Sequence, residues 1–197
     1  MNRKPKTEKK NPETQRGAKG QQPQRKQNKA GECPVYGKCG GCQLLHMEYE
    51  KQLAWKKHQV GELLKPYGKL EGMIGMKEPK YYRHKVHAVF GMDGRGNTVS
   101  GVYREGTHQI VPVDSCLLEN QKADAIIRTV RKLLRSFKIK VYDEDTGYGL
   151  LRHVLVRAGY RTGQIMVVLV LRSPILPSKK HFVEALRKEH PEITTVV

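Results

Sequence analysis

The fold class is decided by residues 81–113, YYRHKVHAVFGMDGRGNTVSGVYREGTHQIVPV. The β-branched and aromatic residues of this stretch form runs that DGRGN and REG interrupt. Both interruptions place glycine beside polar residues, which is typical of turns. The stretch therefore predicts neighbouring strands joined by short turns.

A second hairpin is expected in residues 149–172, GLLRHVLVRAGYRTGQIMVVLVLR, with its turn at GYRTG. Residues 165–171 are apolar at every position, which is typical of a strand that is buried on both faces. We therefore expect this run to be a central strand of the sheet.

Helices are expected around these strands. Apolar residues recur at helical spacing over residues 49–64, and this helix should stop near Pro66 and Gly68. A second helix is expected over residues 119–137, with its apolar residues on one face and its arginines away from it. Ser178 is a candidate cap for a last helix. Strand runs without strict alternation with helices predict an α+β domain with a largely antiparallel sheet and packed helices.

The composition points to a polyanionic partner. The 197 residues hold 37 Lys and Arg against 19 Asp and Glu, so the formal net charge is +18. Nucleic acid is the first candidate for such a basic protein. No apolar run reaches the length of a membrane span, and no hydrophobic segment follows the charged N-terminus. We therefore expect a cytoplasmic protein with no membrane partner, and we expect it to be a monomer.

Residues 1–32 differ from the rest of the chain. They hold ten basic and three acidic side chains and five glutamines, with almost no apolar residues. A segment of this composition cannot bury enough surface to offset the entropy of ordering it. We expect a disordered basic tail, acting either as a sequence-independent RNA tether or as a solubilising segment, before a folded domain over residues 33–197.

Three of the four cysteines lie close together in CPVYGKCGGC, residues 33–42. The spacing is C-x5-C-x2-C, and Cys116 follows after 73 intervening residues. One loop with three thiols and a distant fourth is typical of an iron-sulfur cluster, of the four-iron or the two-iron kind. A zinc site usually shows two C-x2-C pairs, and buried free thiols are the remaining alternative. Gly40 and Gly41 suit a cluster loop, since glycine lets backbone N–H groups approach sulfur.

A basic strand face is the candidate RNA contact. Strand alternation places Arg83, Lys85 and His87 on one face, while Tyr82, His84 and Val86 fall on the opposite, core face. Residues on one face lie about 7 Å apart along a strand, comparable to successive phosphates of an extended nucleic acid.

Two further arginines, Arg152 and Arg157, are weaker candidates for RNA contacts. Between them, His153 shares a face with Leu151 and Leu155 by simple alternation, which predicts a core histidine. His46, four residues after Cys42, is either a contact to the cysteine loop or a histidine at a helix start.

Four segments in this order resemble a known family: CPVYGKCGGCQLLHMEYEKQLAWKK, YYRHKVHAVF, GVYREGTHQIVPVDSCLL and LLRHVLVRAG. They are similar to the central domain of the bacterial RNA uracil-5-methyltransferases, specifically the iron-sulfur members that modify 23S ribosomal RNA. The likeness runs from about Cys33 to the C-terminus. It implies a 4Fe-4S cluster held by Cys33, Cys39, Cys42 and Cys116. It also marks Arg83 and Lys85, in the pattern YRxK, as substrate contacts.

The chain departs from this family in two ways. The N-terminal oligonucleotide-binding barrel of many relatives is replaced by the basic tail, and the catalytic domain that normally follows is missing. Methylation at C5 of uracil needs a nucleophilic thiolate, and all four cysteines are already assigned as ligands. The sequence also lacks a glycine-rich strand-to-helix loop for S-adenosylmethionine.

We therefore expect the RNA-recognition part of a methyltransferase, inactive alone and truncated before the domain that binds S-adenosylmethionine. The alternative is a stand-alone iron-sulfur protein for electron transfer or redox sensing that binds RNA. Radical chemistry with S-adenosylmethionine is disfavoured, because Cys116 is available to close a site that such enzymes leave open.

Overall fold

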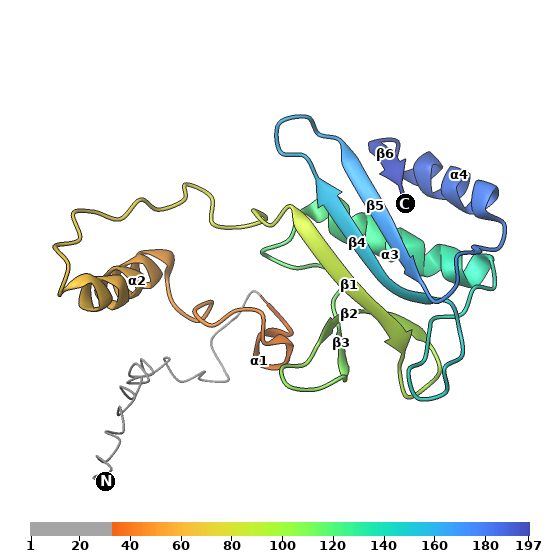
Figure 1. Cartoon of the computed structure of the whole chain (residues 1–197), viewed down its shortest axis with the longest axis horizontal. Coiled ribbons are helices and arrows are strands. Elements are labelled where there is room, and N and C mark those ends of the chain that lie inside the picture. The colour runs from red at the N-terminus through yellow and green to blue at the C-terminus, as the bar shows by residue number, and fades with distance from the viewer. Residues whose placement is uncertain (1–32) are drawn as a thin grey trace, which may run out of the picture.

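The computed structural model describes residues 33–197, so the expected basic tail over residues 1–32 lies outside the described residues. The described chain forms a six-stranded sheet and four helices (Figure 1). The strands are β1 (Lys85–Met92), β2 (Thr98–Tyr103), β3 (Ile110–Pro112), β4 (Leu151–Ala158), β5 (Ile165–Leu171) and β6 (Ile193–Val196). The helices are α1 (Tyr36–Cys39), α2 (Tyr49–Leu64), α3 (Gln121–Ser136) and α4 (Lys179–Glu189).

The sheet has the order β3-β2-β1-β4-β5-β6. Every pairing is antiparallel except that between β5 and β6, which α4 connects. The two hairpins expected from the sequence are present, as β1–β2 and β4–β5, and they meet where β1 pairs with β4. The expected α+β class with a largely antiparallel sheet is confirmed. Strand β5 has a neighbour on each side, but β1 and β4 occupy the centre. Only Ile165, Val167 and Leu169 of β5 are buried, so the expectation of a strand buried on both faces was wrong.

Helices α3 and α4 pack against one face of this sheet and close the hydrophobic core (Figure 1). The core joins alternate residues of β1, β4 and β5, such as Val86, Val154 and Val167, to the apolar faces of both helices. Asn120 caps α3, because its side chain accepts hydrogen bonds from the backbone N–H groups of Lys122 and Ala123. Within residues 33–197, no helix packs on the opposite face of the sheet, which is the open face (Figure 1).

Helix α2 has the bounds predicted from the sequence, but it buries none of its residues. It lies apart from the sheet, joined to β1 by a long extended segment (Figure 1). Exposed apolar side chains are frequent from the middle of this helix onward: Val60, Leu63, Leu64, Tyr67, Met73, Ile74 and Met76. The apolar spacing of residues 49–64 therefore predicted the helix correctly, but the apolar side chains of this helix are not buried against the rest of the domain.

Two local expectations need correction, and one local feature was not predicted. Tyr82 is exposed rather than in the core, because regular β1 begins only at Lys85 and the buried face begins at Val86. Ser178 does stand at the N-cap of α4, but it has a left-handed backbone (φ 51°) and makes no side-chain capping bond. The cysteine loop holds a helical turn, α1, which glycine-rich sequence did not indicate.

Candidate nucleic-acid interface beside the cysteine loop

The cysteine loop is organised around a buried tyrosine. Tyr36, in α1, forms a hydrogen bond with Nδ1 of His46 over 2.8 Å, and its hydroxyl also donates to the carbonyl of Gln43 over 3.3 Å. Gly40 ends α1 with a left-handed backbone (φ 79°), a conformation that favours glycine. Of the two alternatives for His46, the structure therefore shows the contact to the cysteine loop.

Cys116 lies in a segment that pairs with the chain just before β1. The backbone N–H groups of Tyr81 and Arg83 donate to the carbonyls of Leu117 and Leu118, and Asn120 donates to Arg83. Cys116 itself donates its backbone N–H to the Asp124 carboxylate over 2.9 Å. No periodicity of the sequence indicates this pairing, which places Arg83 beside the segment that carries the fourth cysteine.

The thiol of Cys116 is half-buried and accepts a weak hydrogen bond from the N–H of Leu118 over 3.5 Å. Burial raises the pKa of this thiol to about 11, and the nearby acidic groups Glu119 and Asp124 act in the same direction. As a free side chain it is therefore protonated at neutral pH.

The four cysteines have the donor chemistry of an iron-sulfur or zinc site, and all four are partly buried. In residues 33–197, however, no three potential ligands come together as an assembled metal site. What the structure does show is proximity of the two segments: Cys42 lines the same cavity as Leu117 and Leu118, which directly follow Cys116. The donor set fits a metal centre, which would lie at the Cys42 edge of this cavity rather than inside it, because Cys33, Cys39 and Cys116 do not line the cavity.

This cavity has a volume of about 760 Å³. It lies between the cysteine loop, the start of α2 and the segment that leads into β1. Its lining combines apolar groups from Leu117 and Leu118, aromatic rings from Tyr49 and Tyr82, and cationic groups that include Arg83. The Tyr49 hydroxyl accepts a hydrogen bond from the backbone of Met76 over 2.7 Å, which ties the segment after α2 to this helix.

Arg83 is half-exposed at this cavity. Its guanidinium lies 4.0 Å from the carboxylate of Glu119, a residue only 12% exposed. Burial raises the pKa of Glu119 to about 7, and the neighbouring Asp124 charge acts in the same direction, while Arg83 opposes them. The long distance leaves the guanidinium with donors that Glu119 does not occupy.

The other candidate RNA residues lie on the open face of the sheet. Lys85 of β1 is directly opposite Arg157 of β4, and both are exposed. Further along the same face, the rings of His87 and His153, which are diagonal neighbours across the two strands, lie 4.9 Å apart. The structure therefore brings Lys85, His87 and Arg157 into one patch, and it separates Arg83 from them by placing it at the cavity.

Arg152 does not belong to this patch. A register shift between Leu151 and His153 interrupts the pairing of β4 with β5. The Arg152 guanidinium forms an ion pair with Glu144 over 3.1 Å and lies 4.8 Å from the centre of the Tyr142 ring. These contacts with Glu144 and Tyr142 hold the Arg152 side chain away from Arg157.

The same register shift moves His153 to the open face, so the expectation of a core histidine was wrong. Leu151 faces the core, but His153 is paired with Val89 and Val170 and contacts the ring of His87. Its Nδ1 atom is buried and has no hydrogen-bond partner within the described residues. Burial lowers the pKa of His153, and the nearby His87 and Arg152 act in the same direction.

This lowered pKa predicts an acid-dependent loss of stability. The unfolded chain takes up a proton at His153 more readily than the folded chain, so the free energy of unfolding falls as the pH drops below about 6.5. We expect His153→Gln to reduce the fall between pH 7 and pH 5, measured by urea denaturation. His58→Gln on the exposed α2 is the control and should reproduce the wild-type fall. An unchanged pH dependence in His153→Gln would contradict the assignment.

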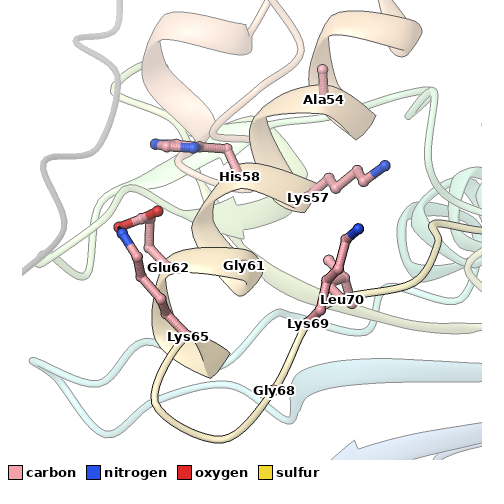
Figure 2. A pocket seen from close by; sticks show the side chains of 9 residues that line it. All are labelled: Ala54, Lys57, His58, Gly61, Glu62, Lys65, Gly68, Lys69 and Leu70. Atoms are coloured by element: carbon pink, nitrogen blue, oxygen red, sulfur yellow. Dashed lines mark ion pairs between the residues drawn. The ribbon is translucent and has the colours of Figure 1, made fainter.

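A second hollow lies on α2, between the helix and the turn that follows it (Figure 2). Lys57, Lys65 and Lys69 line it, and Lys65 forms an exposed ion pair with Glu62 over 3.6 Å. The side chains of Lys57 and Lys69 point toward one another in Figure 2. This surface adds positive charge outside the sheet, but solvent reaches its lysines freely, and charges exposed in this way interact weakly.

Comparison with known proteins gives the site its context. No family model matches the chain. An uncharacterised RNA methyltransferase of Halalkalibacterium halodurans is 41% identical over 170 residues, which are 84% of this chain and 37% of that protein. A similarly described protein of Clostridium acetobutylicum is 39% identical over 172 residues, again 84% of this chain and 37% of the relative. The chain is similar to part of these RNA methyltransferases. It spans less than two fifths of the length of the curated relatives it matches.

The fold also has a solved counterpart. The crystal structure of the Pyrococcus abyssi tRNA (uracil-54, C5)-methyltransferase, in complex with S-adenosyl-L-homocysteine, superimposes with a TM-score of 0.60. The match covers 76% of this chain and 35% of that chain, at 24% sequence identity. At this identity the likeness concerns the fold alone.

Within residues 33–197, no helix is both long and apolar enough to cross a membrane.

Proposed function

We propose that the chain is the RNA-recognition part of an RNA methyltransferase that uses S-adenosylmethionine to methylate C5 of uracil in ribosomal RNA. The observation that carries this proposal is the extended similarity to RNA methyltransferases, which spans 84% of the chain. The target base and the ribosomal substrate rest on the resemblance of the cysteine loop and the YRxK segment. The relatives favour this role over that of an independent electron carrier.

The geometry supports RNA recognition by the open sheet face. Lys85 and Arg157 are opposite each other on the two central strands, and no helix within residues 33–197 covers them. Two adjacent exposed cations on a rigid sheet can contact phosphates without the entropy cost of ordering a loop. The rings of His87 and His153, tilted by 56° to one another, add a surface on the same face for a base or a sugar.

We propose that the thiolate for the chemical step does not come from the cysteines of this chain, which matches about 37% of the length of its relatives. Attack at C6 of uracil needs a thiolate that can also leave, and we assign the four cysteines of this chain to metal binding. We propose that Cys33, Cys39, Cys42 and Cys116 hold a 4Fe-4S cluster. Such a cluster would tie the cysteine loop to the segment that carries Arg83, which is a structural role.

A salt titration tests RNA binding by the sheet face. We expect Lys85→Ala combined with Arg157→Ala to weaken binding of an RNA hairpin loop. The slope of log affinity against log salt should become shallower by about 1.4, which is about 0.7 for each lost phosphate contact. The measurement is fluorescence anisotropy of the full chain over a series of salt concentrations.

The matched control removes the same charge elsewhere. Lys57→Ala combined with Lys65→Ala removes two exposed lysines, one in α2 and one at its C-cap, and should leave the slope nearer to the wild-type value. Equal slopes for wild type and the Lys85/Arg157 double variant, with the fold verified by circular dichroism, would show that the sheet face is not the RNA surface.

A further inference from the structure

We propose that the cavity between the cysteine loop and the segment entering β1 is a binding site for a single unpaired nucleotide of the RNA. Its base would stack on Tyr82, and its phosphate would contact Arg83. This inference rests on the proposed function, because it specifies how the same domain tells a looped RNA from a duplex.

The size and chemistry of the cavity suit such a ligand. Its volume of about 760 Å³ is within the range of about 300–1,000 Å³ typical of small-molecule sites. Apolar side chains of Leu44, Leu117 and Leu118 line it and suit the faces of an aromatic base. Gln43 and Gln52 supply polar groups for the edge of the base, which would otherwise be costly to bury. Because the walls come from three separate segments, the site exists only in the folded domain.

The charge at the cavity favours an anion. Lys56, Lys80 and Arg83 line it, against one acidic side chain, that of Glu48. Arg83 is 44% exposed, and its contact with Glu119 at 4.0 Å is longer than a hydrogen bond. Its planar guanidinium therefore keeps donors that match the oxygens of a phosphate.

Tyr82 supplies the aromatic surface. It is 43% exposed and lines the cavity, although strand alternation alone would send it to the core. The backbone bonds of Tyr81 and Arg83 to the segment after Cys116 hold Tyr82 in place. A large aromatic side chain in a fixed, exposed position beside cationic groups is the arrangement on which unpaired bases stack.

Such a site selects unpaired RNA. In a duplex every base is stacked and paired, so none can enter a cavity without being extruded. In a loop, a splayed base is already unpaired and unstacked, so it can enter the cavity directly. The sheet face would then contribute affinity through phosphates, and the cavity would contribute preference for a loop nucleotide.

The experiment pairs a protein variant with an RNA lacking one base. The probe is a hairpin RNA whose loop contains a single uridine. We expect Tyr82→Ala to weaken its binding about tenfold, since stacking of a base on an aromatic ring contributes substantially to the free energy of binding. Tyr82→Phe keeps the ring and should restore the affinity. Tyr67→Ala, which removes an exposed tyrosine outside this cavity, is the matched control and should bind as the wild type.

The decisive RNA carries an abasic site in place of the unpaired uridine. It should bind the wild type about tenfold more weakly than the intact hairpin, and Tyr82→Ala should cause no further loss with it. The salt slope should stay the same in Tyr82→Ala, unlike in the Lys85/Arg157 double variant, because stacking releases no counterions.

The outcomes separate this inference from the proposed function. Salt-dependent RNA binding that Tyr82→Ala leaves unchanged would overturn the nucleotide site alone. An equal loss in Tyr82→Ala with intact and abasic RNA would overturn it as well, since the effect would not involve the base. A wild-type chain that binds no RNA would overturn both proposals.

Discussion

Replacing Cys116 with serine is expected to remove the proposed 4Fe-4S cluster as completely as replacing Cys39, although Cys116 lies far from the other cysteines in the sequence. When any one of the four cysteine thiolates is removed, one iron atom of a four-iron cluster loses its protein ligand, and the cluster is no longer held stably. Wild-type protein purified without oxygen should contain iron and sulfide in equal amounts, and both variants should contain little of either. The measurements are iron and sulfide analysis and visible absorbance.

Loss of the centre should also loosen the cysteine loop. Metal-binding free energy is folding free energy for residues that the metal orders. We expect limited proteolysis to cut both variants within residues 33–47 while the sheet resists, because the hydrophobic core does not include the loop. The matched control is Ser136→Ala at the end of α3, which should keep the metal. Zinc without sulfide in the wild type would contradict the iron-sulfur assignment.

Truncating Leu186 to alanine is expected to lower the free energy of unfolding by about 3 kcal/mol. This side chain, on α4, is completely buried (0% exposed) in the core between the helices and the sheet. The loss combines the transfer of the removed atoms with the cavity left behind. Equilibrium denaturation with urea, monitored by circular dichroism, measures it.

Leu63→Ala makes the same substitution in another helix and provides the control. Leu63 is 74% exposed on α2, so its truncation should change stability by no more than about 0.5 kcal/mol. A loss for Leu63→Ala as large as that for Leu186→Ala would show that α2 is packed against the domain. A small loss for Leu186→Ala would contradict the core itself.

The strands were predictable because their signals are local. Turns such as DGRGN are defined by neighbouring residues: the Asp93 carboxylate accepts hydrogen bonds from the backbone of Arg95 and Asn97, and Gly96 has a left-handed backbone. Period-two alternation held from Lys85 onward, where regular pairing with β4 begins. The fold class followed from these two hairpins.

The site was less predictable, because its contacts join distant segments. Alternation placed Arg83 in line with Lys85, but pairing with the segment after Cys116 brings Arg83 to the cavity instead. A register shift that the sequence does not mark moved His153 to the open face and turned Arg152 toward Glu144. Periodicity describes one strand at a time, so it cannot report a shift imposed by a neighbouring strand.

The order of the strands also determines how the domain folds. Residues 85–112 and residues 151–171 each form pairings between strands that are neighbours in the chain, and such contacts close short loops. The pairing of β1 with β4 instead joins positions as far apart as Lys85 and Arg157. Loop-closure entropy opposes this step, and non-local pairings slow folding. Docking of the two preformed hairpins, with α3 between them in the chain, is therefore the step expected to limit the folding rate.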